Sequence, residues 1–225
     1  MLNTTSKRFY IILALMSALP PFATDTYLPA IPTMAQFFNV HPSGMLVTMT
    51  TYFIGFSLGM IIWGPLSDIV GRKPVITTGM IIYIVSSILS GQATHLSTLE
   101  VTRCIQAFGD STGITVALSM ARDQFSGHEL TKMTARLTMM VMLAPIVAPL
   151  LGTLALYNHH WQNIFHLLTA YGLLLLLYTH FLPETLNKQQ GIQRIRDVGS
   201  HYLSHFKNTR FLILALCGSL SFSAF

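Results

Sequence analysis

Long apolar segments dominate this 225-residue chain and restrict what it can fold into. A helix needs ~20 mostly apolar residues to cross a hydrocarbon core about 30 Å thick. Six segments approach or exceed that length, at 9–31, 45–65, 75–93, 98–120, 135–157 and 164–182. Backbone polar groups inside a bilayer must be paired within the chain, so segments of this kind are helical. The pattern predicts six transmembrane helices.

The low charge content supports the same class. Only 9% of the residues are charged and 52% are hydrophobic, whereas a soluble domain carries about 25% charged residues to solvate its surface. The chain therefore has too few charges to cover a water-facing surface of this size. The sequence predicts an all-α polytopic membrane protein.

The chain divides into three parts by composition. Residues 1–182 hold the six-helix bundle, and residues 183–210 are polar and basic. Residues 211–225 form a further apolar run of fifteen residues that would reach only about 22 Å as a helix. We expect this last part to be a truncated seventh transmembrane helix.

The basic segment 183–210 has a helical apolar pattern. Apolar side chains recur at three- and four-residue steps, at Ile192, Ile195, Val198, Tyr202 and Phe206. A basic amphipathic helix of this kind lies on the anionic inner leaflet of a membrane. A solvated cytoplasmic linker that is only partly helical is the alternative, and the pattern does not decide between them.

The distribution of Lys and Arg predicts the topology. All but one of the 13 basic residues lie before the first helix, between helices two and three, between helices four and five, or after the sixth. The loops on the other side, 33–44, 94–97 and 158–163, contain none. The positive-inside rule then gives a cytoplasmic N-terminus and a cytoplasmic 183–210 segment. The net charge of +5 is explained by topology, and we do not expect nucleic-acid binding.

Three ionisable residues lie inside the predicted spans: Asp25, Arg103 and Asp110. A charge at the bilayer centre costs at least ~2.5 kcal/mol, so such residues face a bundle interior or a wet cavity. Asp25 and Arg103 fall at a similar depth below the outer face, and Asp110 lies two helical turns from Arg103 on the same face. We expect the three to line one cavity wall and to bind substrate and protons. A structural salt bridge is the alternative.

Prolines and small residues mark two helices. Pro20-Pro21 in the first span and Pro145 and Pro149 in the fifth remove backbone hydrogen bonds, so we expect them to interrupt and bend these helices. Small residues repeat at every fourth position of the fifth span, at Ala144, Ala148 and Gly152. Such a face allows another helix to approach closely.

The segment "GPLSDIVGRKPV" resembles the loop motif Gly-x-Leu-Ala-Asp-x-x-Gly-Arg-Lys of the major facilitator superfamily. "RCIQAFGDS" resembles its helix-four motif, and "APIVAPLLGT" is similar to its helix-five antiporter motif, in which Pro149 and Gly152 match and Ala144 and Ala148 replace glycines. Asp110 replaces a small residue of the family pattern, so its role is not implied by the resemblance. The matched loop residues are Gly64, Leu66, Asp68, Gly71, Arg72 and Lys73.

The combination of "TDTYLPAIP", "MARDQF", "LAPIVAPLLG" and "LPETL" resembles the bicyclomycin-resistance (Bcr/CflA) type of drug exporter. The resemblance implies the six-helix N-terminal half of a major-facilitator fold, built as two inverted three-helix repeats. It also implies an inner gate at 64–75, in which Gly64 and Gly71 allow tight turning and Asp68 contacts helix ends. Arg72 and Lys73 would lie at the anionic inner surface, with Pro74 in the first turn of helix three.

The resulting hypothesis is proton-coupled export of small, largely apolar drugs across the cytoplasmic membrane. It requires the proton gradient, membrane lipid and a C-terminal six-helix half, and it requires no cofactor or metal. A metabolite carrier on the same fold and an inactive truncated membrane fragment are the alternatives. No Gly-x-Ser-x-Gly, phosphate-binding glycine loop or His-Glu-x-x-His occurs, so we do not expect an enzyme.

Overall fold

The computed structural model of the chain describes residues 7–156 and 160–186. The part of the chain within these ranges is helical throughout, apart from short connections. The helices are α1 (Lys7–Asp25), α2 (Ile31–Phe37), α3 (Leu46–Val70), α4 (Arg72–Gly91), α5 (Leu96–Gln124), α6 (Gly127–Ala155) and α7 (Gln162–Phe181). Two 3-10 turns, Leu28–Ala30 and Pro42–Met45, precede α2 and α3.

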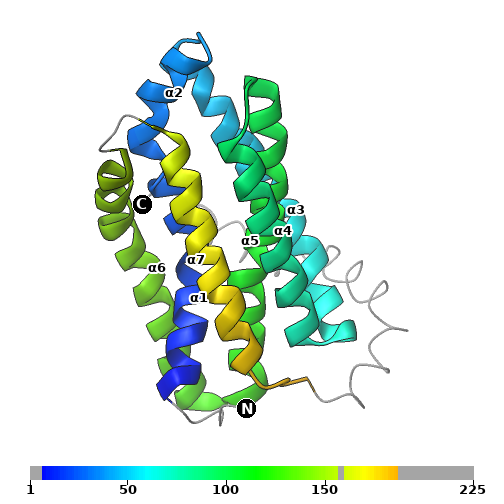
Figure 1. Ribbon diagram of the computed structural model, residues 1–225. Helices are drawn as coiled ribbons and strands as arrows, with labels where there is room; N and C mark the ends of the chain where they lie inside the picture. The colour runs from blue at the N-terminus through cyan, green and yellow to red at the C-terminus, as the bar shows by residue number, and fades with distance from the viewer. Residues whose placement is uncertain (1–6, 157–159, 187–225) are drawn as a thin grey trace, which may run out of the picture. The chain divides into compact units, whose positions relative to one another are not determined.

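The helices form an elongated bundle (Figure 1). Five described segments are long and apolar enough to cross a membrane: Phe9–Phe37, Pro42–Val70, Arg72–Gly91, Gly127–Ala155 and Gln162–Phe181. The remaining predicted span, 98–120, corresponds to α5, which is as long as α6 but more polar. About half of the α5 residues are buried against other helices. Its polar side chains therefore do not have to face lipid, and the six-helix prediction is confirmed.

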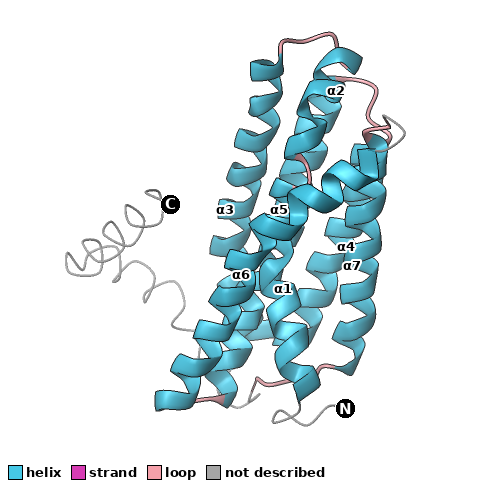
Figure 2. Ribbon diagram, turned by 90° about the vertical axis from the view of Figure 1, so that its left-hand side faces the viewer, coloured by secondary structure: helices cyan, strands magenta, loops and turns pink. Residues whose placement is uncertain are grey.

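Several helix contacts agree with an inverted repeat of α1, α3 and α4 onto α5, α6 and α7, whereas the α4–α5 contact is much more extensive than its counterpart α1–α7. In that repeat α1 corresponds to α5, α3 to α6 and α4 to α7. The contact of α3 with α5 then corresponds to the contact of α6 with α1, and both are extensive. The repeat exchanges α1 with α5 and α4 with α7, so it maps the α1–α5 contact and the α4–α7 contact each onto itself. Both contacts are present. Figure 2 shows α3, α5, α1 and α6 side by side, in agreement with this pairing.

The prolines do not interrupt their helices, which corrects the prediction. α1 continues through Pro20 and Pro21 to Asp25, and α6 continues through Pro145 and Pro149. Pro20 has no N–H for the carbonyl of Met16 one turn earlier. That carbonyl faces Gly113 of α5, where an added Cβ would be 2.6 Å from the Met16 oxygen. The proline and the glycine together allow α1 and α5 to approach closely.

The small-residue face of α6 packs as predicted. Ala144, Ala148 and Gly152 are buried, while the opposite side of the helix is exposed. A Cβ at Gly152 would collide with the backbone carbonyl of Thr26 in the first span. The face therefore provides the contact between α6 and the first span, as close packing of small residues requires.

The amphipathic helix predicted in 183–210 and the seventh helix predicted in 211–225 fall almost wholly outside the described residues. Of these segments only residues 183–186 are described, and they continue without regular structure after α7.

Candidate functional site: a buried polar centre and a polar cluster at the basic end

Arg103 of α5 is completely buried inside the bundle. Its guanidinium carbon lies 4.5 Å from the ring centroid of Tyr27 and 4.3 Å from that of Tyr52. The cation is thus placed between two aromatic rings from two other segments, one after α1 and one in α3. Desolvated cation–π contacts of this kind are worth about 2 kcal/mol each.

The guanidinium also donates hydrogen bonds to three helices. Nη1 donates to the Gln106 Oε1 at 2.8 Å and to the Ala23 carbonyl at 3.5 Å, and Nη2 lies 3.8 Å from the Met49 sulfur. Gln106 in turn donates to Ser87 Oγ of α4 at 2.6 Å. Arg103 therefore joins α5 to α1 and α3, and Gln106 extends the network to α4.

Asp110 lies two turns further along α5 and is also fully buried. The Tyr52 hydroxyl donates to Asp110 Oδ2, while Oδ1 has no hydrogen-bond partner within residues 7–156 and 160–186. Tyr52 consequently touches both charged groups: its ring packs on Arg103 and its hydroxyl binds Asp110. The prediction that Arg103 and Asp110 share an inward face agrees with this geometry.

Asp25 differs from the other two residues. It is half-buried at the end of α1 and accepts a hydrogen bond from Thr24 Oγ1 at 3.2 Å. Among the described residues no ion pair joins Asp25 to Arg103. Arg103 reaches the first span at the Ala23 carbonyl and the Tyr27 ring instead. The shared depth predicted for Asp25 and Arg103 therefore does not bring their charged groups into an ion pair in this conformation.

Sequence reasoning missed the tyrosines of this centre. Tyr27 donates or accepts a 2.7 Å hydrogen bond with Thr48, and Tyr83 of α4 has a buried hydroxyl with no partner in the described part of the chain. A tyrosine inside an apolar span carries a signal, because its buried hydroxyl needs a partner. The sequence does not indicate which group the tyrosine hydroxyl pairs with.

A second polar cluster lies where the α3–α4 junction meets the ends of α5 and α7. Arg72 is only 2% exposed. Its Nε and Nη2 donate to the two Asp123 oxygens at 2.9 and 3.2 Å, and its Nη1 lies 2.6 Å from both Asp68 Oδ1 and Ser67 Oγ. Arg72 therefore faces inward, which corrects the expectation that it lies at the membrane surface.

The N-terminus of α4 is capped from a distant part of the chain. Glu184, which follows α7, accepts hydrogen bonds from the backbone N–H groups of Arg72 and Lys73 at 3.0 and 3.1 Å. A carboxylate is favourable at a helix N-terminus because the first N–H groups have no partner in the helix. Lys73 Nζ donates to the His180 carbonyl at 2.7 Å. The cluster ties the end of α7 to the start of α4.

The predicted loop at 64–75 is almost entirely helical. Gly64 lies inside α3 and does not form a turn, contrary to the expectation. Gly71 alone separates α3 from α4, and its φ of +117° is a conformation that L side chains rarely adopt. A Cβ at Gly71 would also lie 2.8 Å from Glu184 Oε2. Pro74 is in the first turn of α4, as predicted.

Asp123→Asn should destabilise the bundle by about 2 kcal/mol, because the buried Arg72 cation loses a charged acceptor. The measurement is the unfolding free energy in mixed micelles. Glu129→Gln is the matched control, since it weakens the exposed pair between Glu129 and Lys132, 3.0 Å apart, and should leave stability unchanged. Equal stability of the two variants would show that Arg72 does not depend on Asp123.

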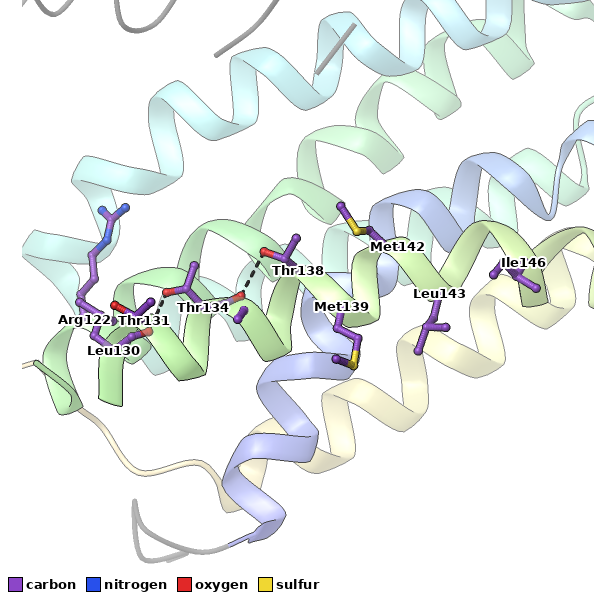
Figure 3. A pocket seen from close by; sticks show the side chains of 10 residues that line it. Arg122, Leu130, Thr131, Thr134, Thr138, Met139, Met142, Leu143 and Ile146 are labelled. Carbon is purple, nitrogen blue, oxygen red and sulfur yellow. Dashed lines mark hydrogen bonds between the residues drawn. The ribbon is translucent and has the colours of Figure 1, made fainter. Parts of the chain in front are cut away.

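A groove of about 950 Å³ runs along α6 on the side away from its small-residue face. Figure 3 shows threonines at one end of the groove and methionines and aliphatic residues toward the other. The lining residues do not include Asp25, Arg103 or Asp110. They are Arg122, Leu130, Thr131, Thr134, Ala135, Thr138, Met139, Met142, Leu143 and Ile146.

The fold and the buried centre define a polytopic α-helical membrane protein with ionisable groups inside its helices. The family model of the Major Facilitator Superfamily matches residues 13–225. The chain belongs to the major facilitator superfamily.

The chain is similar to bacterial proteins that are named for drug resistance. The chain is 31% identical over 216 residues to a bicyclomycin resistance protein homolog of Haemophilus influenzae, covering 95% of this chain and 54% of that protein. It is 29% identical over 214 residues to the multidrug resistance protein MdtL of Vibrio parahaemolyticus, covering 93% and 54%. The chain thus spans about half the length of the curated relatives it matches.

Solved structures show the same fold. A D-xylose-proton symporter has a TM-score of 0.71 at 12% identity, over 92% of this chain and 54% of that chain. The human organic anion transporter MFSD10 (TETRAN) has a TM-score of 0.70 at 16% identity, over 84% and 50%. The matched portion is again about half of each structure, as expected for a six-helix half of this fold.

Proposed function

We propose that this chain forms the N-terminal half of a proton-coupled exporter of small, largely apolar drugs in a bacterial-type cytoplasmic membrane. The observation that carries the proposal is the buried centre of Arg103, Tyr52 and Asp110. Ionisable groups inside membrane helices are costly, and they mark ion and substrate pathways and proton relays. The names of the two bacterial relatives support drug export as the direction and substrate class.

The groove on α6 supports an apolar substrate. Met139 is 61% exposed and Met142 is 63% exposed, and both line the groove. Methionine side chains are flexible and polarizable, and they suit surfaces that accept ligands of varied shape. The threonine end of the groove contributes few free donors, because Thr134 and Thr138 donate to carbonyls of their own helix. We propose that drugs contact the methionine end.

The polar cluster around Arg72 fits an inner gate. Alternating access in this kind of carrier moves six-helix bundles as rigid units. Arg72, Asp123 and Glu184 fasten the ends of α4, α5 and α7 to one another. We propose that this cluster keeps the adjoining ends of α4, α5 and α7 rigid. We also propose that the cluster lies on the cytoplasmic side of the membrane, in accordance with the distribution of Lys and Arg.

The test is export of ethidium and bicyclomycin from cells that express the protein from its native gene. Export that a protonophore abolishes supports the proposal, whereas drug accumulation in the cells that is unaffected by expression contradicts it.

The two alternatives, a metabolite carrier and an inactive fragment, can be distinguished in the same cells. A metabolite carrier would move solutes but not these drugs. An inactive fragment would have the intact mass of this chain, 25.0 kDa, and would move nothing. A species of about twice that mass would contain a second six-helix half.

Asp25→Asn should abolish ethidium export while leaving the protein in the membrane. Asp25 is half-buried at the end of α1 and lies close in the chain to the Arg103 contacts at Ala23 and Tyr27, which supports our proposal that its carboxylate contacts the substrate. Export rates and membrane abundance measured together provide the check. Normal export by Asp25→Asn would remove this residue from the transport pathway.

A further inference from the structure

The buried centre holds two opposite charges that do not touch each other. Arg103 makes no ion pair among the described residues, and Asp110 accepts its one described hydrogen bond from Tyr52. The Tyr52 side chain stands between them, since its ring lies against the guanidinium and its hydroxyl binds the carboxylate. The three residues form one charge-balanced unit spread over α3 and α5.

Charge balance matters here because the unit is excluded from water. Arg103 and Asp110 are both 0% exposed. An isolated charge in such a place is strongly unfavourable, whereas a nearby opposite charge offsets part of the cost. Guanidinium does not lose its proton in proteins. Asp110 is therefore the member of the pair that can change its charge.

We propose that Asp110 is the proton-binding carboxylate of this chain and that Tyr52 is the positioning residue that links the Asp110 charge to Arg103. This inference rests on the proton coupling proposed above. The proton would add to Oδ1, the oxygen with no described partner, and convert the carboxylate to a carboxylic acid. Tyr52 keeps its own hydrogen and its bond to Oδ2, so no other covalent bond changes.

Proton uptake changes the charge balance around Arg103. The unit goes from a net charge of zero to +1, and the guanidinium loses its compensating anion. Arg103 holds α5 to the Ala23 carbonyl of α1 and to Met49 and Tyr52 of α3. The proton therefore acts on the contacts among three helices. A conformational change that relieves the uncompensated cation would be favoured by proton binding.

Asp25 lacks this arrangement. It is half-buried, its described hydrogen bond comes from the adjacent Thr24, and it makes no described contact with Arg103. The charged and titratable groups around Asp110 come from every helix near it: Arg103 on α5, Tyr52 on α3, Tyr83 on α4 and Tyr171 on α7. Asp110 is the carboxylate among them.

The test is infrared spectroscopy of the full chain in vesicles of phosphatidylethanolamine and phosphatidylglycerol, without drug. Lowering the pH should produce the carbonyl band of one buried protonated carboxylic acid in the wild type. Asp110→Asn should lose this band, and the control Glu129→Gln, which changes an exposed carboxyl outside the buried centre, should keep it. A band that persists in Asp110→Asn, or that disappears in Glu129→Gln, would overturn the assignment.

Tyr52→Phe tests the positioning role, and it also carries the test if Asp110→Asn does not accumulate. Phenylalanine keeps the ring against Arg103 and removes the hydroxyl. The carboxylic acid band should move in frequency, because its hydrogen bond is lost, and ethidium-dependent proton movement should fall at least tenfold. An unmoved band refutes the link through Tyr52. A band that behaves as stated without any ethidium export would refute the proposed function and leave the proton site intact.

Discussion

Arg103→Met should destabilise the bundle by about 3–5 kcal/mol and abolish ethidium export. The cost arises because removing one partner of a buried charge pair leaves the other uncompensated. Here Asp110 would keep its hydrogen bond from Tyr52 but lose the cation on the far side of that ring. The unfolding free energy in mixed micelles and the export rate are the two measurements.

Two further variants separate charge from geometry. Arg103→Met combined with Asp110→Asn removes both charges and should recover part of the lost stability without recovering export. Arg103→Lys keeps the charge but cannot lie flat between two rings and donate as a fork. We expect it to insert and fold but to export at a small fraction of the wild-type rate. Arg122→Met, on an exposed position of the same helix, is the stability control. A double variant no more stable than Arg103→Met would show that the two charges are not coupled.

Gly55→Ala should destabilise the bundle by about 2 kcal/mol and reduce the amount of protein in the membrane. A Cβ at this position of α3 would collide with the backbone carbonyl of Cys104 in α5. Backbone cannot move aside as a side chain tip can, so the two helices would have to separate. Overfilling a closely packed site typically costs 1–3 kcal/mol, and the gain in helix propensity of up to ~1 kcal/mol offsets only part of it.

The control for Gly55→Ala is Gly44→Ala. Gly44 lies in the turn before α3, where an added Cβ would meet only the Val40 Cβ at an ordinary 3.7 Å. Thermal unfolding of both variants in the same detergent should show a lower midpoint for Gly55→Ala alone. Similar midpoints would mean that α3 and α5 can separate at little cost.

The number and approximate position of the spans could be predicted from hydropathy, since a bilayer imposes length and polarity on any helix that crosses it. The ends were less accurate. α3 continues to Val70, five residues beyond the predicted end at 65, because the polar residues Ser67 and Asp68 find partners at Arg72. Local composition does not reveal partners across a helix junction.

The candidate site was predicted in part. The free-energy cost of a charge inside the bilayer singles out Arg103 and Asp110, and the helical period places them on one face of the helix. Tyr52 was not found, because its role depends on α3 lying against α5 at one particular register. Glu184 was not found for the same reason: its partners, the N–H groups of Arg72 and Lys73, are more than a hundred residues away in the chain.

The sequence by itself determined the membrane class, the six spans, the asymmetry of basic residues and the presence of charges that must be buried. These four properties follow from composition and from spacing along the chain, because a bilayer constrains the length and the polarity of each segment that crosses it. Tertiary structure alone decided which groups surround those charges. Arg103 meets two tyrosine rings and a carbonyl rather than Asp25, because the close approach of α1, α3 and α5 at Gly113 and Gly55 fixes which side chains share the interior.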